Sequence, residues 1–196
     1  MKHLVITIGC EYGAKGNAIG KKIAQDLGIK FYDRDLVDEI IKEVGIPTDI
    51  MDRVEEGGTI AGKGAQGDVR GSFSKYADLT DRAIHVQKQI IRKLAQKEAC
   101  VIIGRSADYI LKDRDDVLNV FIHGNMPEKT QRIMGLYNVE EKEAVKMMAD
   151  TDKRRMTNYN FYTDQKWGKT SNYTLCLNSS QLGYDRCEMI IMECVK

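Results

Sequence analysis

Apolar positions along the chain fall into two alternating patterns. Five short runs are rich in apolar, β-branched or aromatic residues, and they cover residues 4–8, 29–33, 99–105, 117–124 and 173–177. Such runs are typical of strands in a parallel sheet whose two faces are both covered. Between them, apolar residues recur three and four positions apart, as they do on the buried face of a helix. The alternation predicts an α/β fold with five strands.

The sequence marks the ends of some predicted helices. Gly28 can end the first helix in a left-handed conformation. Asn138 and Glu141 resemble a capping box that opens a later helix. Residues 55–75 contain six glycines, which predicts a mobile, solvent-facing loop before a helix over 80–97. That loop is either a linker or a substrate flap.

The first run leads through the glycine-rich turn GCEYGAKGN, residues 9–17, into a helical pattern. Backbone N–H groups at the start of a helix have no partner within the helix, and the helix dipole adds partial positive charge there. A strand, a glycine turn and a helix N-terminus in this order form an anion site. We therefore expect a phosphate group to bind at this turn.

The turn matches a Walker A loop, G-x-x-x-x-G-K-[ST], only in part. Counted from Gly9, Lys15 takes the lysine position, but Ala14 replaces the second glycine and Gly16 replaces the hydroxyl residue that would bind Mg²⁺. An ordinary strand-to-helix turn and a dinucleotide-binding turn remain alternatives. The dinucleotide fold has an acidic residue about 20 positions further on, near where Asp33 stands, although Asp33 could equally cap the following helix.

Composition narrows the class of protein. A length of 196 residues fits one domain, and a net charge of +1 provides no basic field for nucleic acid. No apolar run approaches the ~20 residues of a membrane span, and the chain enters a strand at once, without a secretory leader. Five cysteines without a C-x-x-C pair fit a reducing cytoplasm, and three distant histidines predict no metal site.

Two basic segments are candidates for binding an anion. Arg105 ends the third run, where its planar guanidinium group suits a phosphate, although a lone arginine often forms only a surface salt bridge. The stretch 150–173 interleaves basic and aromatic side chains, namely Lys153, Arg154, Arg155, Lys166 and Lys169 with Tyr159, Phe161, Tyr162 and Trp167. This mixture suits single-stranded nucleic acid, which the near-neutral chain disfavours, or a solvated helix end.

In this order and spacing, the motifs resemble those of the cytidylate kinase-like family, relatives of bacterial CMP kinase in the P-loop kinase superfamily. The resemblance covers nearly the whole chain and rests on ITIGCEYGAKG, GKKIAQDLG, FYDRDL, VIIGRSADYIL, VFIHG, DKRR, FYTDQKWG and YTLCLNSSQLG. It implies a three-layer α/β/α fold with core segments 1–33, 99–150 and 171–196. It also implies a helical insertion at 34–98 that binds a nucleoside monophosphate, and a small lid at 151–170.

The resemblance implies roles for single residues as well. The phosphate loop for ATP would comprise Gly9, Gly13, Ala14, Lys15, Gly16 and Asn17. The acceptor nucleotide would contact Asp33 and Arg105. Lys15 would act in catalysis with Arg132, on the helix that leads to the lid, and with Arg154 and Arg155, which would close on the transferred phosphoryl group. ATP and Mg²⁺ are the implied cofactors, nucleotides are the implied partners, and a homodimer stays open.

Several positions depart from the CMP kinase pattern. When the chain is laid on that pattern without a gap, Gly16 takes the lysine position, Lys15 stands one residue early and Asn17 replaces the hydroxyl residue. Ser106 stands where CMP kinases carry an aspartate after Gly-Arg, and Glu11 brings a carboxylate to the loop. We expect Lys15 to contact phosphate and partly replace the missing lysine.

Two functions follow as hypotheses. The first is an ATP-dependent kinase of a nucleoside monophosphate, CMP or dCMP foremost, or of another small acceptor. The second is a nucleotide-binding protein of the same fold with little or no transfer activity. A short-chain dehydrogenase is a weaker alternative, because Tyr162-x-x-x-Lys166 follows Gly9-x-x-x-Gly13. That Tyr–Lys pair has no helical pattern around it, and the chain is short for the class.

Overall fold

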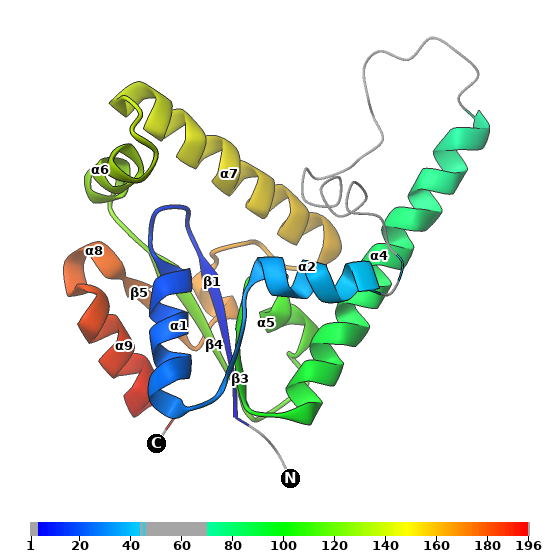
Figure 1. The fold of residues 1–196 in the computed structure, drawn as a ribbon, viewed down its shortest axis with the longest axis horizontal. Coiled ribbons are helices and arrows are strands. Elements are labelled where there is room, and N and C mark those ends of the chain that lie inside the picture. Colours follow the sequence, from blue (N-terminus) through cyan, green and yellow to red (C-terminus); the bar gives the residue numbers. More distant parts are fainter. Residues whose placement is uncertain (1–3, 44, 46–69, 196) are drawn as a thin grey trace.

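The computed structural model describes residues 4–43, 45 and 70–195 (Figure 1). The strands within these residues are β1 (Val5–Cys10), β2 (Lys30–Tyr32), β3 (Cys100–Ile103), β4 (Val117–His123) and β5 (Leu175–Asn178). All neighbours pair in parallel, in the order β2-β3-β1-β4-β5. The predicted five-stranded parallel sheet is confirmed, and each apolar run of the sequence contributes one strand.

β1 lies in the middle of the sheet and is paired along both of its edges. Ile8, near its end, lies opposite Ile103 of β3 and Val120 of β4. Because the strands are parallel, their carboxyl ends share one edge of the sheet, where ligands of open α/β sheets bind. The segment that leaves β1 therefore starts at the centre of that edge.

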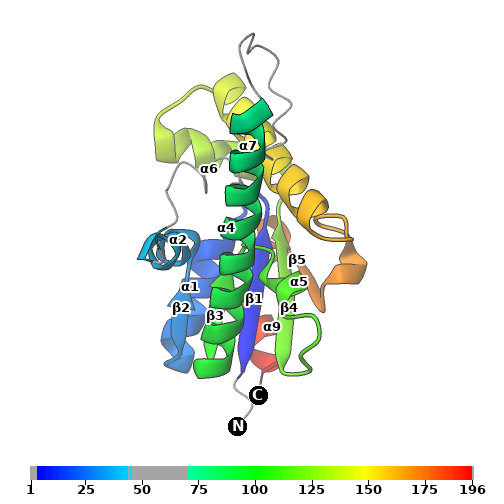
Figure 2. The same cartoon turned by 90° about the vertical axis from the view of Figure 1, so that its right-hand side faces the viewer.

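Helices cover both faces of the sheet (Figures 1 and 2). In chain order they are α1 (Gly16–Leu27), α2 (Arg34–Glu43), α4 (Arg70–Lys97), α5 (Ala107–Ile110), α6 (Met126–Tyr137), α7 (Glu141–Tyr162), α8 (Ser179–Leu182) and α9 (Tyr184–Glu193), with a 3₁₀ turn at Thr170–Asn172. Apolar side chains of α1 and α9 pack with Ile6 and Ile8 on one face. Those of α2, α4 and α5 pack with Val5 and Ile102 on the other. The three-layer α/β/α prediction is thereby confirmed.

α6 and α7 form a hairpin beyond the carboxyl edge of the sheet (Figure 1). They pack together through Ile133, Ala144 and Met148. α7 is continuous over 22 residues because neither glycine nor proline interrupts it. The predicted lid therefore begins in the middle of a helix, and the basic segment after residue 150 is its second half.

Two helix boundaries differ from the sequence-based predictions. α4 begins at Arg70, so the last residues of the predicted 55–75 loop are helical, while 55–69 lie outside the described residues. Asn138 does not open α7 but ends α6 with a left-handed φ of 53°, and Glu140 precedes α7 without a side-chain cap. Asparagine tolerates this conformation better than most residues do, and the capping-box pattern concealed that role. Gly28 ends α1 with φ 63°, as predicted.

Candidate phosphate loop and adjoining cavity

A loop of residues 11–15 joins β1 to α1, and its backbone is left-handed at two positions. Gly13 has φ 83°, and a Cβ atom there would lie 3.2 Å from the Cβ of Lys129. Lys15 has φ 60° and immediately precedes α1 without a side-chain cap for the first helical amides. Those amides have no partner inside the helix, and although the Gly16 amide donates to the Cys10 sulfur, the amides that follow it are available to an anion. The predicted order of strand, glycine turn and helix is confirmed.

Cationic side chains reach this loop from three directions. Arg132 of α6 donates a hydrogen bond from Nη1 to the Gly13 carbonyl oxygen. Arg155 of α7 donates from Nη1 to the carbonyl oxygen of Cys10 at 2.7 Å. The Nζ of Lys15 lies 4.3 Å from the centre of the Tyr184 ring. Arg132 thus holds the backbone of the loop, Arg155 holds the end of β1 just before it, and the lysine lies against an aromatic ring.

Two carboxylates also contact the loop or its supports. Glu11 accepts a hydrogen bond at 2.8 Å from Lys129 Nζ, which is buried, and another at 3.1 Å from the Gly124 amide. Asp152 of α7 accepts from the Tyr12 amide at 2.7 Å, and burial raises the pKa of its carboxyl group. The loop is therefore fixed by α6 and α7 as well as by the sheet.

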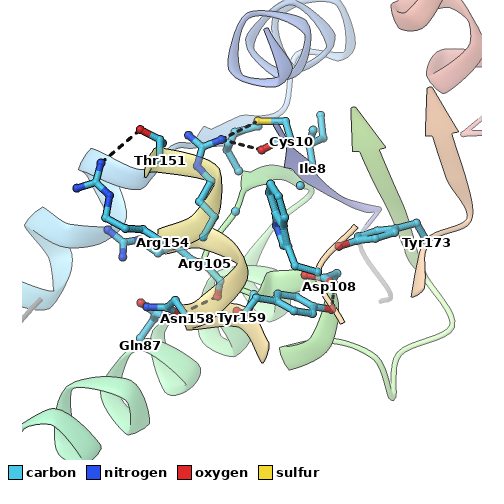
Figure 3. Close-up of a pocket in the computed structure, with 16 residues that line it drawn as sticks. Ile8, Cys10, Gln87, Arg105, Asp108, Thr151, Arg154, Asn158, Tyr159 and Tyr173 are labelled. Carbon is cyan, nitrogen blue, oxygen red and sulfur yellow. Dashed lines mark hydrogen bonds between the residues drawn. The ribbon is translucent and has the colours of Figure 1, made fainter. Parts of the chain in front are cut away.

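A cavity of about 170 Å³ opens beside the loop. The ends of β1 and β3 form one wall, and the second half of α7 forms another (Figure 3). Among the residues proposed from sequence, Gly9, Arg105, Arg154 and Arg155 line this cavity. Arg154 donates to Thr151 Oγ1 at 3.3 Å (Figure 3), and Arg155 is the next residue of α7. The cavity thus lies between the arginine-rich helix and the centre of the sheet edge.

The remaining predicted site residues divide between the loop and places outside it. Ala14 is fully buried in the loop, and its carbonyl oxygen accepts a hydrogen bond at 2.9 Å from Ser179 Oγ. Gly16 and Asn17 begin α1. Asp33 does not line the cavity, because its Oδ1 caps α2 by accepting from the Leu36 amide at 3.0 Å.

Arg105 lines the cavity, but its guanidinium group is engaged by a neighbouring carboxylate. Its guanidinium group forms an ion pair with Asp38 of α2, and only 6% of its side chain is exposed. Its backbone, with φ 55°, turns the chain away from β3, and its carbonyl oxygen accepts from Gln87 Nε2 at 3.3 Å. Arg105 therefore forms a salt bridge, but a buried one rather than the surface pair of the alternative, and its partner belongs to the predicted insertion.

Polar and aromatic groups close the inner end of the cavity. The Tyr159 hydroxyl lies 2.6 Å from Asp108 Oδ2 and 2.7 Å from Gln165 Oε1. Burial raises the pKa of the Asp108 carboxyl group. The Trp167 ring packs edge-on against Phe121 at 5.3 Å between ring centres. This wall presents aromatic surface to the cavity.

Sequence reasoning missed the residues that support the loop. Lys129 sits in a helix whose polar residues all appear solvent-facing, and nothing in its spacing indicates that it is buried against Glu11. Asp152 belongs to the DKRR segment, but only the arginines of that segment were assigned a role. In the part of the chain that the structure describes, no group of three or more histidine, cysteine, aspartate or glutamate residues could hold a metal. No helix there has the length and hydropathy to cross a membrane.

Comparison with known proteins places the fold and the family. The model of the cytidylate kinase-like family matches residues 5–181. The structure of an uncharacterized protein from Eubacterium ventriosum ATCC 27560 is 29% identical, with a TM-score of 0.77 over 98% of each chain. None of the curated proteins matches the chain.

More distant structures share the fold. Shikimate kinase from Bacteroides thetaiotaomicron is 15% identical, with a TM-score of 0.54 over 98% of each chain. A gluconokinase from Sinorhizobium meliloti 1021 is also 15% identical, with a TM-score of 0.50 over 97% of this chain and 93% of its own. These neighbours argue against the short-chain dehydrogenase alternative. The chain has the fold of the P-loop kinases and belongs to the cytidylate kinase-like family.

Proposed function

We propose that the protein is an ATP-dependent phosphotransferase whose acceptor is a nucleoside monophosphate, CMP or dCMP foremost, or a related small molecule. One observation carries this proposal: the phosphate loop and the cavity share the end of β1, and Arg155 contacts that strand end while lining the cavity. A phosphoryl donor on the loop and an acceptor in the cavity would then meet beside the same arginine. The family and fold support the kinase class.

In this proposal the residues act mainly by positioning and by neutralising charge. The first amides of α1 bind the donor's phosphates, and Lys15 leaves the Tyr184 ring to join them. Arg154 and Arg155 offset the charge that develops on the transferred group. Arg132 keeps the Gly13 turn in shape through its bond to the carbonyl oxygen.

The two acceptor residues inferred from the family pattern keep this role as proposals. Arg105 would act by holding Asp38, and with it α2, against the cavity, or by exchanging that partner for the acceptor's phosphate. Asp33 would act through the α2 N-terminus that it caps. Each role requires the predicted insertion to contact the acceptor.

Mg²⁺ would accompany ATP, and Asn17 is the loop residue that could hold it. Its amide oxygen is a hard donor, and the side chain is exposed at the start of α1. Mg²⁺ would supply charge neutralisation on the phosphates and usually keeps several waters. Glu11 and Asp152 are less suited, since they already bind Lys129 and the Tyr12 amide.

A nucleotide-binding protein without transfer activity is the second candidate. Two observations favour it: Lys15 lies on Tyr184 rather than over the loop, and Asn17 offers no hydroxyl group. Such a protein would bind ATP with the same loop but would not accelerate transfer.

A coupled assay of ADP formation distinguishes the two candidate functions. The acceptor panel contains CMP, dCMP, UMP and AMP, with shikimate and gluconate as the acceptors named for the structural neighbours. We expect ADP release only with a nucleotide, and a loss of at least about tenfold in kcat for Arg154→Ala, roughly 1.4 kcal/mol. Arg186→Ala, an exposed arginine of α9, is the matched control. ATP binding by calorimetry without any ADP release would favour the second candidate.

A further inference from the structure

Gln87 of α4 is a buried amide in the wall of the cavity. Its residue is 8% exposed, and its Nε2 donates to the carbonyl oxygen of Arg105 at 3.3 Å. Figure 3 shows this bond below Arg154 of α7. Gln87 therefore lies where the predicted insertion meets the end of β3.

The bond to Arg105 fixes which atom of the amide remains for a ligand. If the nitrogen and oxygen were exchanged, two oxygens would face each other, so the assignment of Nε2 as the donor follows from its partner. The carbonyl oxygen Oε1 is then left as an acceptor. No group among the described residues donates a hydrogen bond to it. Buried polar atoms in native proteins nearly always have a partner, so a ligand is a candidate for this one.

The other polar groups of the cavity define the rest of that ligand. Arg155 faces the cavity from the β1 side, where it contacts Cys10, whereas Gln87 faces it from the β3 side. A ligand that satisfies both carries an anionic group toward the arginines and an N–H or O–H donor toward Gln87. A carbonyl or carboxylate oxygen at the second position would instead be repelled by Oε1.

We propose that Gln87 is a specificity-determining residue that accepts a hydrogen bond from the acceptor substrate. This inference rests on the proposed function for the identity of the acceptor as a nucleoside monophosphate. Among pyrimidines, cytosine presents an amino group at ring position 4, whereas uracil presents a carbonyl oxygen there. The donor on the acceptor is therefore the cytosine amino group, and the site selects CMP over UMP. A polyol hydroxyl is the alternative source of such a donor.

A double-mutant cycle between protein and ligand tests this contact by binding alone. Wild type and Gln87→Met are titrated calorimetrically with CMP and with the analogue that lacks the 4-amino group, pyrimidin-2-one ribonucleoside 5′-monophosphate. We expect wild type to bind CMP at least about tenfold more tightly than the analogue, which is roughly the worth of one hydrogen bond. In Gln87→Met the ratio should fall to about two or less. Gln89→Met, an exposed residue of the same helix that pairs with His85, should keep the wild-type ratio.

A structural role for Gln87 would give a different result. If Gln87 only supported Arg105, its replacement would weaken both ligands equally and leave their ratio unchanged, which would overturn the proposal. Equal affinities of wild type for CMP and the analogue would overturn it even if Gln87→Met did not fold. Tighter binding of shikimate or gluconate than of any nucleotide would assign the donor to a hydroxyl group and overturn the cytosine assignment.

The binding cycle and the ADP assay can fail separately. Amino-dependent CMP binding without ADP release supports the role of Gln87 and overturns phosphoryl transfer. ADP release with an acceptor that Gln87→Met binds as well as wild type does supports transfer and overturns the role of Gln87.

Discussion

Replacing Gly16 by alanine should destabilise the protein although alanine is the better helix former. Gly16 is the first residue of α1 and lies directly against the end of β1. A Cβ atom at this position would lie 2.5 Å from the Cβ of Cys10 and 2.8 Å from its Sγ. Both distances are well inside van der Waals contact, so helix and strand would have to separate.

Two opposing effects determine how much Gly16→Ala changes the free energy of unfolding. Overpacking a well-filled core costs about 1–3 kcal/mol. Alanine returns up to about 1 kcal/mol of the backbone entropy that glycine loses in a helix, and less in the first turn. With a gain of about 0.5 kcal/mol in the first turn, the net loss should be about 0.5–2.5 kcal/mol. For a chain of this size it lowers the melting temperature by roughly 1–10 °C.

Gly135→Ala is the matched control, because Gly135 is exposed in α6 and a Cβ atom there would meet nothing within 4 Å. Only the entropy term applies, so this variant should be stabilised by about 0.5–1 kcal/mol. Thermal and urea unfolding, followed by circular dichroism, measure both variants. Phosphate binding should weaken in Gly16→Ala alone.

A melting temperature of Gly16→Ala at or above that of wild type would refute this prediction. A second variant deletes the Cys10 side chain with which the new Cβ atom would collide. In the Cys10→Gly/Gly16→Ala protein the loss should be smaller than the sum of the two single losses, because the colliding atoms are in direct contact. Strict additivity would mean that the collision is not the cause.

Three further predictions concern the loop and its supports. Lys129→Met should cost about 1.5–3 kcal/mol, because Glu11 loses its ammonium partner, and Glu11→Gln in the same chain should recover part of this in urea unfolding. Asp152→Asn should leave stability unchanged below about pH 4 and raise it above, because burial raises the pKa of this carboxyl group in the folded state and its ionisation then opposes folding; a stability difference that is flat with pH would contradict this. Lys15→Met should lower ATP affinity at least about tenfold by calorimetry, and an unchanged affinity would mean that the lysine stays on Tyr184.

The sheet could be predicted because the burial of its strands is directly visible in their apolar sequences. β1, β3 and β4 lie between covered faces, so their apolar runs are continuous and few other structures suit them. The turn after β1 could be predicted for a similar reason, since Gly13 must take a left-handed conformation beside Lys129. Local sequence was sufficient wherever the local environment decided the structure.

Contacts between residues far apart in the sequence could not be predicted from the pattern of apolar and polar positions. The second half of α7 is polar on most sides because it borders a cavity and the loop, so it lacks the apolar periodicity that marks a helix. Arg105 looked like an open phosphate ligand because its partner, Asp38, lies 67 residues away in sequence. Gln87 had no visible role, since its importance depends on an oxygen without a donor and not on its spacing.

The unbroken course of α7 has a mechanical consequence. Asp152 holds the loop, Arg154 and Arg155 face the cavity, and Tyr159 closes its inner end, all from one rod about 33 Å long. These groups cannot approach a ligand one at a time, because a straight helix without glycine or proline resists bending. Any closure over the cavity would therefore be a rigid-body rotation of α7 about its connection to α6 at Asn138. If the two ligands bind as proposed, a movement of α7 toward one of them would also displace the loop through Asp152, so the two binding events would be coupled.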